Sequence, residues 1–284
     1  MCQMINLNDL IHDLNFFNYK ELFTSNRDTN IFLIKNDRKN IIYKKVFDLC
    51  LKRYNQIIYL NKILVYNDFY TPKILDSKLD KKSNVGYFLY EFIEKDREFL
   101  RNKRDFEKLA DGVINFYDLT KNFKSDIIFK PFKDDLYLKF ENINSYYKKL
   151  YLKVVKNIEK NKDKRRFIFR DLHKKNLIIS KEKFYFLDLD DCKVGNIEFD
   201  LANIFISFGF NKLDLYYLKM YSFFLNKIKK KVEVNLELLV DFIIYVLMIY
   251  YNKSKKTLID KKLILTKINW VVRNREKLIK IFSL

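Results

Sequence analysis

Three short stretches in the second half of the chain decide the fold: FRDLHKKNLII (residues 169–179), FYFLDLDD (184–191) and EFDLAN (198–203). The first two place a polar loop before an apolar run, then a turn and a second apolar run that ends in acidic residues. Apolar, β-branched and aromatic runs around a short turn are typical of a hairpin. We therefore predict strands over 177–179 and 184–187, joined by a turn over 180–183.

The polar residues around this hairpin suggest phosphoryl transfer. Asp171 and Asn176 stand at the two ends of the polar loop, and Asp188 stands where the hairpin ends. Folding of the hairpin is expected to bring all three together. Two carboxylates and a carboxamide oxygen suit Mg²⁺, which takes few protein ligands and completes its shell with water and phosphate oxygens. In such sites one Asp accepts the proton of the attacking hydroxyl group, while other side chains hold the metal against the phosphates.

The first 90 or so residues predict a small α+β lobe. Apolar and aromatic runs at 31–34 and 41–46 flank a turn-rich spacer and predict a hairpin. Apolar residues at helical spacing follow over 49–64 and end before Pro72, and another apolar run at 87–93 predicts a further strand.

From Asp105 onward the apolar spacing is mainly helical, apart from the island around the hairpin. The helices we predict cover 105–120, 133–160, 198–208, 212–229, 235–252 and 260–282. The chain as a whole therefore reads as α+β, with a β-rich first part and a mainly helical second part.

Taken in order, the three stretches resemble the catalytic segment of the aminoglycoside phosphotransferase and choline kinase superfamily. This resemblance implies a bilobal protein-kinase-like fold, with a nucleotide-binding lobe and hinge over residues 1–94 and a helical lobe with the acceptor pocket over 95–284. It implies that Asp171 is the catalytic base, that Asn176 and Asp188 are metal ligands, and that Asp200 is structural. His173 corresponds to a structural member of the family's loop.

The resemblance extends to the first lobe. The strand IIYKKV (41–46) would direct a lysine toward the nucleotide, and we choose Lys44. Lys45 remains an alternative for this role, because strand alternation gives each lysine apolar neighbours on its own face of the strand. The segment YFLYEFIE (87–94) resembles the family's hinge, which implies that the backbone around Glu91, Phe92 and Ile93 binds the adenine edge.

Three features depart from the family's pattern. The turn expected to cover the nucleotide, residues 25–30, contains no glycine. Asn55 or Gln56 occupies the approximate position of the helix glutamate that pairs with the lysine, so Lys44 has no obvious ionic partner in the sequence. Phe169 stands where the family often has histidine.

These observations predict a small-molecule kinase that uses Mg²⁺ and ATP, or GTP, to phosphorylate a hydroxyl group of a choline, ethanolamine, aminoglycoside or sugar type of acceptor. A lipopolysaccharide-core or other cell-envelope sugar kinase is one alternative. A catalytically weak binding or scaffold protein with the same fold is another. The short step from Asp188 to Asp200 leaves no room for a long activation segment, which disfavours a protein kinase.

The formal net charge of +20 suggests an anionic partner at first sight. Abundant Lys, Asn, Ile and Tyr throughout the chain indicate a compositional bias instead, so we expect no nucleic-acid partner, while contact with a membrane surface stays open. The longest apolar run, 242–251, is too short to cross a bilayer. Three scattered cysteines and acidic residues near the N-terminus predict a cytoplasmic protein. The sequence predicts neither the acceptor nor the oligomeric state.

Overall fold

The computed structural model describes residues 7–12, 19–24, 29–35, 40–100, 102–123, 143–161, 164–209, 215–253 and 258–284. The chain divides into two compact units, one made of Met1–Glu98 with Ile178–Leu189 and the other of Phe99–Leu177 with Asp190–Leu284. Each unit is described by itself. The assignment of nucleotide binding to 1–94 and acceptor binding to 95–284 stays a prediction.

Within its described ranges, the first unit contains a five-stranded antiparallel sheet with the strand order β1-β2-β3-β5-β4. The strands are β1 (Tyr19–Thr24), β2 (Thr29–Ile34), β3 (Ile41–Val46), β4 (Ile74–Asp80) and β5 (Val85–Glu91). The predicted hairpin of 31–34 with 41–46 is confirmed as β2 and β3. Strands β1 and β4 were not predicted, because both lie at the sheet's edges and β4 is largely polar.

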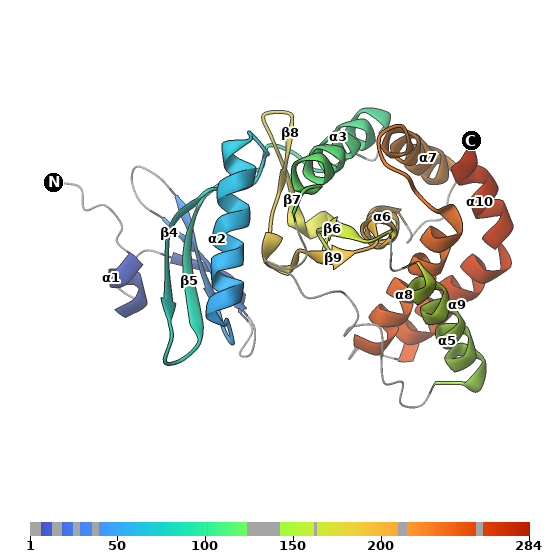
Figure 1. Ribbon diagram of the computed structural model, residues 1–284, viewed down its shortest axis with the longest axis horizontal. Helices are drawn as coiled ribbons and strands as arrows, with labels where there is room; N and C mark the ends of the chain where they lie inside the picture. Colours follow the sequence, from blue (N-terminus) through green and yellow to red (C-terminus); the bar gives the residue numbers. More distant parts are fainter. Residues whose placement is uncertain are drawn as a thin grey trace. The chain divides into compact units, whose positions relative to one another are not determined.

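Helices cover both faces of this sheet. Ile41 and Tyr43 of β3 pack into a cluster with Leu7 and Leu10 of α1 (Leu7–His12). On the opposite face, Phe88 of β5 packs with Leu49 and with Ile57 of α2 (Leu51–Tyr66), and Figure 1 shows α2 lying along the sheet. Both faces of β3 are therefore partly apolar, although only one of them faces α2.

The predicted second hairpin is confirmed as β7 (Leu177–Ser180) and β8 (Lys183–Phe186), which pair with each other. Its second strand is fixed to the segment that follows α2: Phe186 N donates to Tyr70 O at 2.9 Å, and Thr71 Oγ1 donates to Phe186 O at 2.9 Å. The hairpin thus belongs to the first unit for most of its length.

The second unit is mainly helical, with a small pairing of β6 (Arg166–Ile168) and β9 (Lys193–Gly195). Its described helices are α3 (Lys103–Thr120), α5 (Ser145–Lys160), α6 (Ile197–Gly209), α7 (Leu215–Lys229), α8 (Leu236–Lys253), α9 (Leu258–Arg273) and α10 (Arg275–Ser283). Among them, α6 packs against α8, α3 against α7, and α8 also against α5, α9 and α10. Short 3₁₀ turns occupy η4 (Lys174–Asn176) and η5 (Leu189–Asp191).

Two predicted helices differ from the observed ones. The helix predicted over 260–282 is divided at Asn274, where α9 ends and α10 begins. The helix predicted over 133–160 is observed from Ser145, where the Asn144 side chain accepts from Tyr146 N. Residues 133–142 and the first residues of the helix predicted over 212–229 lie outside the described residues, as do 25–28 of the turn without glycine.

Candidate active site

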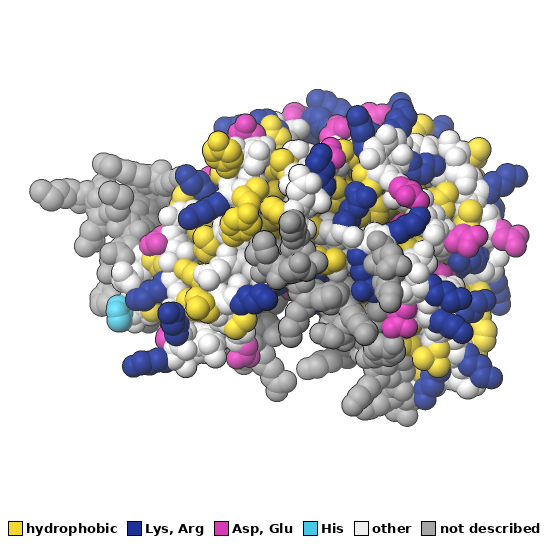
Figure 2. Space-filling model, viewed as in Figure 1, with side chains coloured by type: hydrophobic (Ala, Val, Ile, Leu, Met, Phe, Trp, Pro, Cys, Tyr) yellow, Lys and Arg dark blue, Asp and Glu magenta, His cyan; other side chains and the backbone are white. Residues whose placement is uncertain are grey.

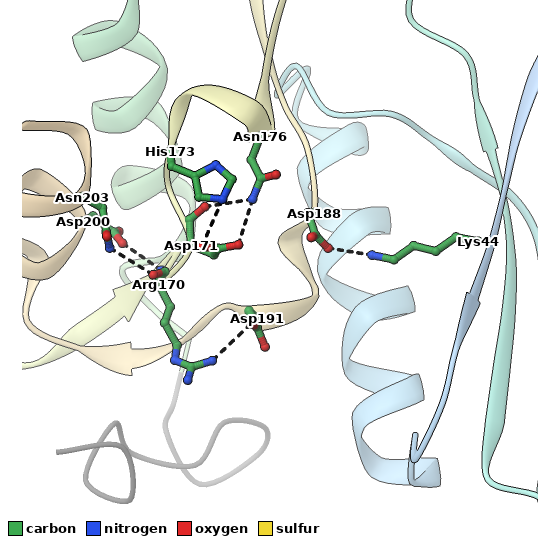
Figure 3. A network of polar contacts seen from close by, with 9 residues as sticks. All are labelled: Lys44, Arg170, Asp171, His173, Asn176, Asp188, Asp191, Asp200 and Asn203. Atoms are coloured by element: carbon green, nitrogen blue, oxygen red, sulfur yellow. Dashed lines mark hydrogen bonds and ion pairs between the residues drawn. The ribbon is translucent and has the colours of Figure 1, made fainter. Parts of the chain in front are cut away.

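Asp171 and Asn176 are joined across the polar loop. Asn176 Nδ2 donates to the main-chain oxygen of Asp171 and to Asp171 Oδ2, both at 3.0 Å (Figure 3). Both acceptors require an N–H group, so these contacts set the orientation of the amide and direct Asn176 Oδ1 away from Asp171. The loop therefore fixes one carboxylate and turns one carboxamide oxygen outward, which is a donor that a hard cation accepts.

His173 lies beside the same carboxylate, with its Nε2 3.5 Å from Asp171 Oδ1. Its main-chain oxygen accepts from Asn176 N at 2.9 Å and closes the 3₁₀ turn η4. Its Nδ1 is buried and has no hydrogen-bond partner among the residues the structure describes. The backbone contact fits the predicted structural place of His173 in the loop.

Asp200 accepts main-chain hydrogen bonds from the start of the loop. Its Oδ2 accepts from Phe169 N and its Oδ1 from Arg170 N, each at 2.8 Å, and Tyr117 Oη also donates to Oδ2 at 3.0 Å. Arg170 has a φ of 67°, a left-handed conformation that side chains other than glycine rarely adopt. The buried carboxylate stabilises this conformation because it accepts the main-chain N–H groups that the turn exposes.

The charge of Asp200 depends on a balance between burial and hydrogen bonding. Burial raises the pKa of Asp200 and the hydrogen bonds from Phe169, Arg170 and Tyr117 partly offset this, in that order of effect, so that the pKa is about 7. Asp200 is fully buried on α6. Asp200 thus holds the backbone at the start of the loop, which is the kind of structural role that the sequence resemblance implied.

Arg170 is held by two further residues. Asn203 Nδ2 donates to Arg170 O at 3.2 Å, and the Arg170 guanidinium lies 3.2 Å from Asp191 Oδ2 (Figure 3). Asp191 belongs to the turn η5 that follows Asp188 in the sequence. The ion pair therefore links the loop before the hairpin to the segment after it, within the second unit.

Phe169 occupies the place where histidine was expected, and its surroundings account for the difference. The side chain is 3% exposed and its ring stacks on Phe116, with centroids 3.7 Å apart. Phe167 and Tyr117 also lie near these rings. A phenylalanine suits this aromatic environment, while the main-chain N–H group that donates to Asp200 is supplied by any residue except proline.

Lys44 and Asp188 form an ion pair in the first unit. Lys44 Nζ lies 2.6 Å from Asp188 Oδ1, and the two side chains are 7% and 41% exposed (Figure 3). A buried ammonium group needs such a partner. The expectation that Lys44 lacks an ionic partner is therefore wrong: Asp188, predicted as a metal ligand, pairs with it. Asp188 has a φ of 55°, a strained conformation that directs its side chain at the end of the hairpin.

The sheet register separates Lys44 from Lys45. Lys44 lies directly opposite Phe88, on the face that packs against α2. The ammonium of Lys45 lies 4.8 Å from the ring centroid of Phe47 and 5.9 Å from that of Tyr87, which packs against the cluster on the other face. The side chains of Lys44 and Lys45 therefore lie on opposite faces of the sheet.

The remaining predicted residues lie at the end of β5, directly after it, and on α2. Glu91 ends β5, and its N–H donates to Lys73 O at 3.0 Å. Phe92 and Ile93 follow the strand and are partly buried. On α2, Asn55 is exposed whereas Gln56 is 6% exposed, so Gln56 is the one that faces the interior. The role of the 91–93 backbone in nucleotide binding stays a prediction.

Surface charge, candidate metal ligands and hydropathy add three observations. Figure 2 shows Lys and Arg side chains spread over the visible face, with Asp and Glu among them. Among the described residues, no group of three or more His, Cys, Asp or Glu side chains is arranged to hold a metal ion. None of the described helices combines the length and the apolar character that a membrane crossing requires.

The sequence matches a known family over more than half of its length. The phosphotransferase enzyme family (APH) matches residues 59–224, which include the catalytic loop, the hairpin and Asp200. No curated protein sequence matches the chain.

Solved structures with the same fold cover most of the chain at low identity. An amicoumacin kinase, hAmiN, in complex with AMP-PNP, Ca²⁺ and Ami has a TM-score of 0.69 and 14% identity, over 88% of this chain and 87% of that one. The choline kinase LicA from Streptococcus pneumoniae has a TM-score of 0.59 and 16% identity, over 94% and 93%. A thermostable mutant of the aminoglycoside phosphotransferase APH(4)-Ia, in a ternary complex with AMP-PNP and hygromycin B, has a TM-score of 0.60 and 10% identity, over 97% of each chain. The predicted kinase-like fold, an antiparallel sheet followed by a mostly helical part, is thereby confirmed.

Proposed function

This chain belongs to the phosphotransferase enzyme family, and on that basis we propose that it is a kinase that transfers the terminal phosphoryl group of ATP or GTP to a hydroxyl group of a small molecule. The observation that carries the proposal is the Asp171 carboxylate, whose Oδ2 accepts a hydrogen bond from Asn176 Nδ2 while the main-chain oxygen of Asp171 accepts a second one from the same group. A general base must be held in place and must keep an oxygen for the incoming hydroxyl group. The loop meets the first requirement, and the exposure of the Asp171 side chain, 44%, suits the second.

The donor set fits Mg²⁺. Asn176 Oδ1 and the Asp188 carboxylate are hard oxygen donors, and few protein ligands suffice for this ion. We propose these two residues as the ones that would hold it; when bound, Mg²⁺ would neutralise charge on the nucleotide phosphates. The match to structures that contain AMP-PNP, one of them with Ca²⁺, supports a nucleotide with a divalent cation.

Each of the proposed site residues has its own role in the transfer. The acceptor oxygen attacks the terminal phosphorus, its proton passes to Asp171, and the bond from that phosphorus to the bridging oxygen breaks to release the nucleoside diphosphate. Lys44 exchanges its partner Asp188 for phosphate oxygens as the nucleotide binds. The backbone at Glu91, Phe92 and Ile93 would take the adenine edge.

The acceptor class is proposed from the similar structures. Their names refer to amicoumacin, choline and an aminoglycoside phosphotransferase with hygromycin B. We propose a hydroxylated acceptor of the choline, ethanolamine, aminoglycoside or sugar type.

The test is a transfer assay with the whole chain, Mg²⁺ and either ATP or GTP, against amino alcohols, aminoglycosides, sugars and core-oligosaccharide fragments. Phosphorylated products are identified by mass spectrometry. Transfer to one of the first three classes supports the proposal, whereas transfer confined to core fragments supports an envelope sugar kinase. Nucleotide binding with no transfer supports a scaffold protein, and absence of nucleotide binding contradicts the proposal.

A further inference from the structure

The turn of the second hairpin has an unfavourable conformation for its sequence. Lys181 and Glu182 form the two-residue loop between β7 and β8, and their φ values are 47° and 60°. A two-residue hairpin loop with positive φ at both positions is of type I′, which strongly favours Asn and Gly. Lysine and glutamate carry a Cβ that crowds the backbone in this region. The turn therefore needs support from elsewhere in the chain.

That support comes from Asp96 and Arg97, just after the predicted hinge. Asp96 Oδ2 accepts a hydrogen bond from Lys181 N. The Arg97 guanidinium contacts both carboxylate oxygens of Glu182, with Nε 3.2 Å from Oε1 and Nη2 3.4 Å from Oε2. Each strained residue thus has its own polar partner, and all four lie in the first unit.

The same two residues also bind the first strand of the hairpin. Asp96 N donates to Ile179 O at 2.9 Å, and Arg97 forms an antiparallel bridge with Ile179. We call Asp96 and Arg97 together the turn clamp. It contacts β7 through its backbone and the turn through its side chains.

The turn matters because it sets where β8 ends. The type of a hairpin turn fixes the register of its two strands, and a shift by one residue reverses every side chain of the strand. β8 ends at Phe186, and Asp188 stands two positions further on. A turn that relaxed to another type would therefore displace the Asp188 carboxylate from Lys44.

We propose that Asp96 and Arg97 are positioning residues, which hold the strained turn at 181–182 and thereby place Asp188 against Lys44. The catalytic consequence rests on the proposed function, since Asp188 is there a metal ligand. The placement itself is a property of the first unit and can be measured without turnover.

The first measurement is the rate at which acetyl N-hydroxysuccinimide modifies Lys44 in the nucleotide-free protein, followed by peptide mass spectrometry. Asp96→Ala is expected to increase this rate roughly tenfold, the effect of losing one hydrogen bond to a charged group. Lys95→Ala is the matched control, because Lys95 is adjacent and pairs with Glu98 instead of the hairpin. It should leave the rate unchanged. Equal rates in Asp96→Ala and wild type would overturn the proposal.

A rescue separates positioning from a general loss of structure. An Asn-Gly loop adopts the type I′ conformation without strain, so Lys181→Asn with Glu182→Gly should make the clamp dispensable. Asp96→Ala in that background is expected to return Lys44 to its wild-type reactivity. If the rate stays high there, Asp96 does not act through the turn and the proposal is overturned.

Kinetics give the second readout. Asp96→Ala should raise the Mg²⁺ concentration for half-maximal rate by roughly tenfold and change kcat less, because Asp188 would be displaced while Asp171 is not; the opposite split would contradict the proposal. A wild-type chain without any transfer activity would refute the proposed function, and Lys44 reactivity would still decide the role of the clamp.

Discussion

The ammonium of Lys44 lies 2.6 Å from a carboxylate oxygen of Asp188, although the two residues are 144 positions apart in the sequence. The Asp188 carboxylate thereby neutralises the charge of a lysine side chain that is only 7% exposed. Under the proposed function, nucleotide and Mg²⁺ take over both charges when they bind, so each partner of the ion pair acquires a new counter-ion. The lysine is thus held in place before the nucleotide arrives.

Replacement of Lys44 tests this assignment against its neighbour. Lys44→Met is expected to lower kcat/KM by roughly 10²-fold, because a preorganised positive group near the transferred phosphate is lost. Lys45→Met is the matched control, since Lys45 contacts Phe47 and Tyr87 on the other face of the sheet. Steady-state kinetics check both. A larger loss of kcat/KM in Lys45→Met than in Lys44→Met would show that Lys45 contacts the phosphate and that the assignment to Lys44 is wrong.

Asn176 is predicted to act on metal affinity. Asn176→Ala removes the oxygen donor together with the two hydrogen bonds to Asp171. The Mg²⁺ concentration at half-maximal rate should rise by roughly tenfold or more. Asn203→Ala, which removes the bond to Arg170 O, serves as a control and should leave the Mg²⁺ requirement near that of wild type. An unchanged Mg²⁺ requirement in Asn176→Ala would argue against its role as a ligand.

Asp200 should make stability depend on pH. Burial raises its pKa to about 7 in the folded protein, above roughly 3.9 for an unperturbed aspartate. Its contribution to stability is therefore complete below pH ~4 and is lost as the pH rises through about 7. The Tyr117 hydrogen bond opposes this loss, because it stabilises the ionised carboxylate.

Tyr117→Phe should consequently destabilise the protein more at pH 8 than at pH 5, by about 1–2 kcal/mol in the free energy of unfolding. Tyr221→Phe is the control: its hydroxyl donates to Leu201 O at 2.8 Å, a neutral acceptor, so its effect should not depend on pH. Urea unfolding at both pH values measures the difference. A Tyr117→Phe effect that is equal at the two pH values would contradict the account.

The contribution of the sequence differs between parts of the molecule. Asp171 and Asn176 stand at the two ends of one short loop, so their contact could be predicted from neighbouring residues. That Asp188 joins them at a metal ion stays a prediction. The choice between Lys44 and Lys45 could not be predicted, because α1 and α2 give both faces of β3 apolar partners. Tyr117 lies in an apolar stripe of α3, so its sequence position suggests an ordinary core residue. Its hydroxyl group donates to Asp200, which lies 83 positions further along the chain.

Edge strands show the same limit. β4 has the sequence ILDSKLD and contains no buried residue, so its strand conformation depends on pairing with β5 and its sequence carries little apolar signal of its own. The turn clamp of Asp96 and Arg97 could likewise not be predicted from the sequence, because the strain at Lys181 and Glu182 arises only once the hairpin has formed.

An ion pair with a buried carboxylate in the helical unit should be important for stability. Asp241 of α8 is 5% exposed, lies 2.5 Å from Arg275 Nη1 and accepts from Asn157 Nδ2 at 3.1 Å. Arg275→Met leaves this carboxylate without its cation and should cost about 3 kcal/mol. Lys164→Met, whose partner Glu233 is solvated, should have no measurable effect. Equal stability of the two variants in thermal unfolding would contradict this ranking.

The most direct test of the central claim is phosphoryl transfer by Asp171→Asn, measured with the acceptor found in the transfer assay. Asparagine preserves the size of the side chain and can still accept from Asn176 Nδ2, while it cannot take a proton. The account predicts a kcat lower by roughly 10²–10⁴-fold, with nucleotide affinity in the presence of Mg²⁺ close to that of wild type. A kcat close to that of wild type in Asp171→Asn would show that another group accepts the proton and would contradict the account.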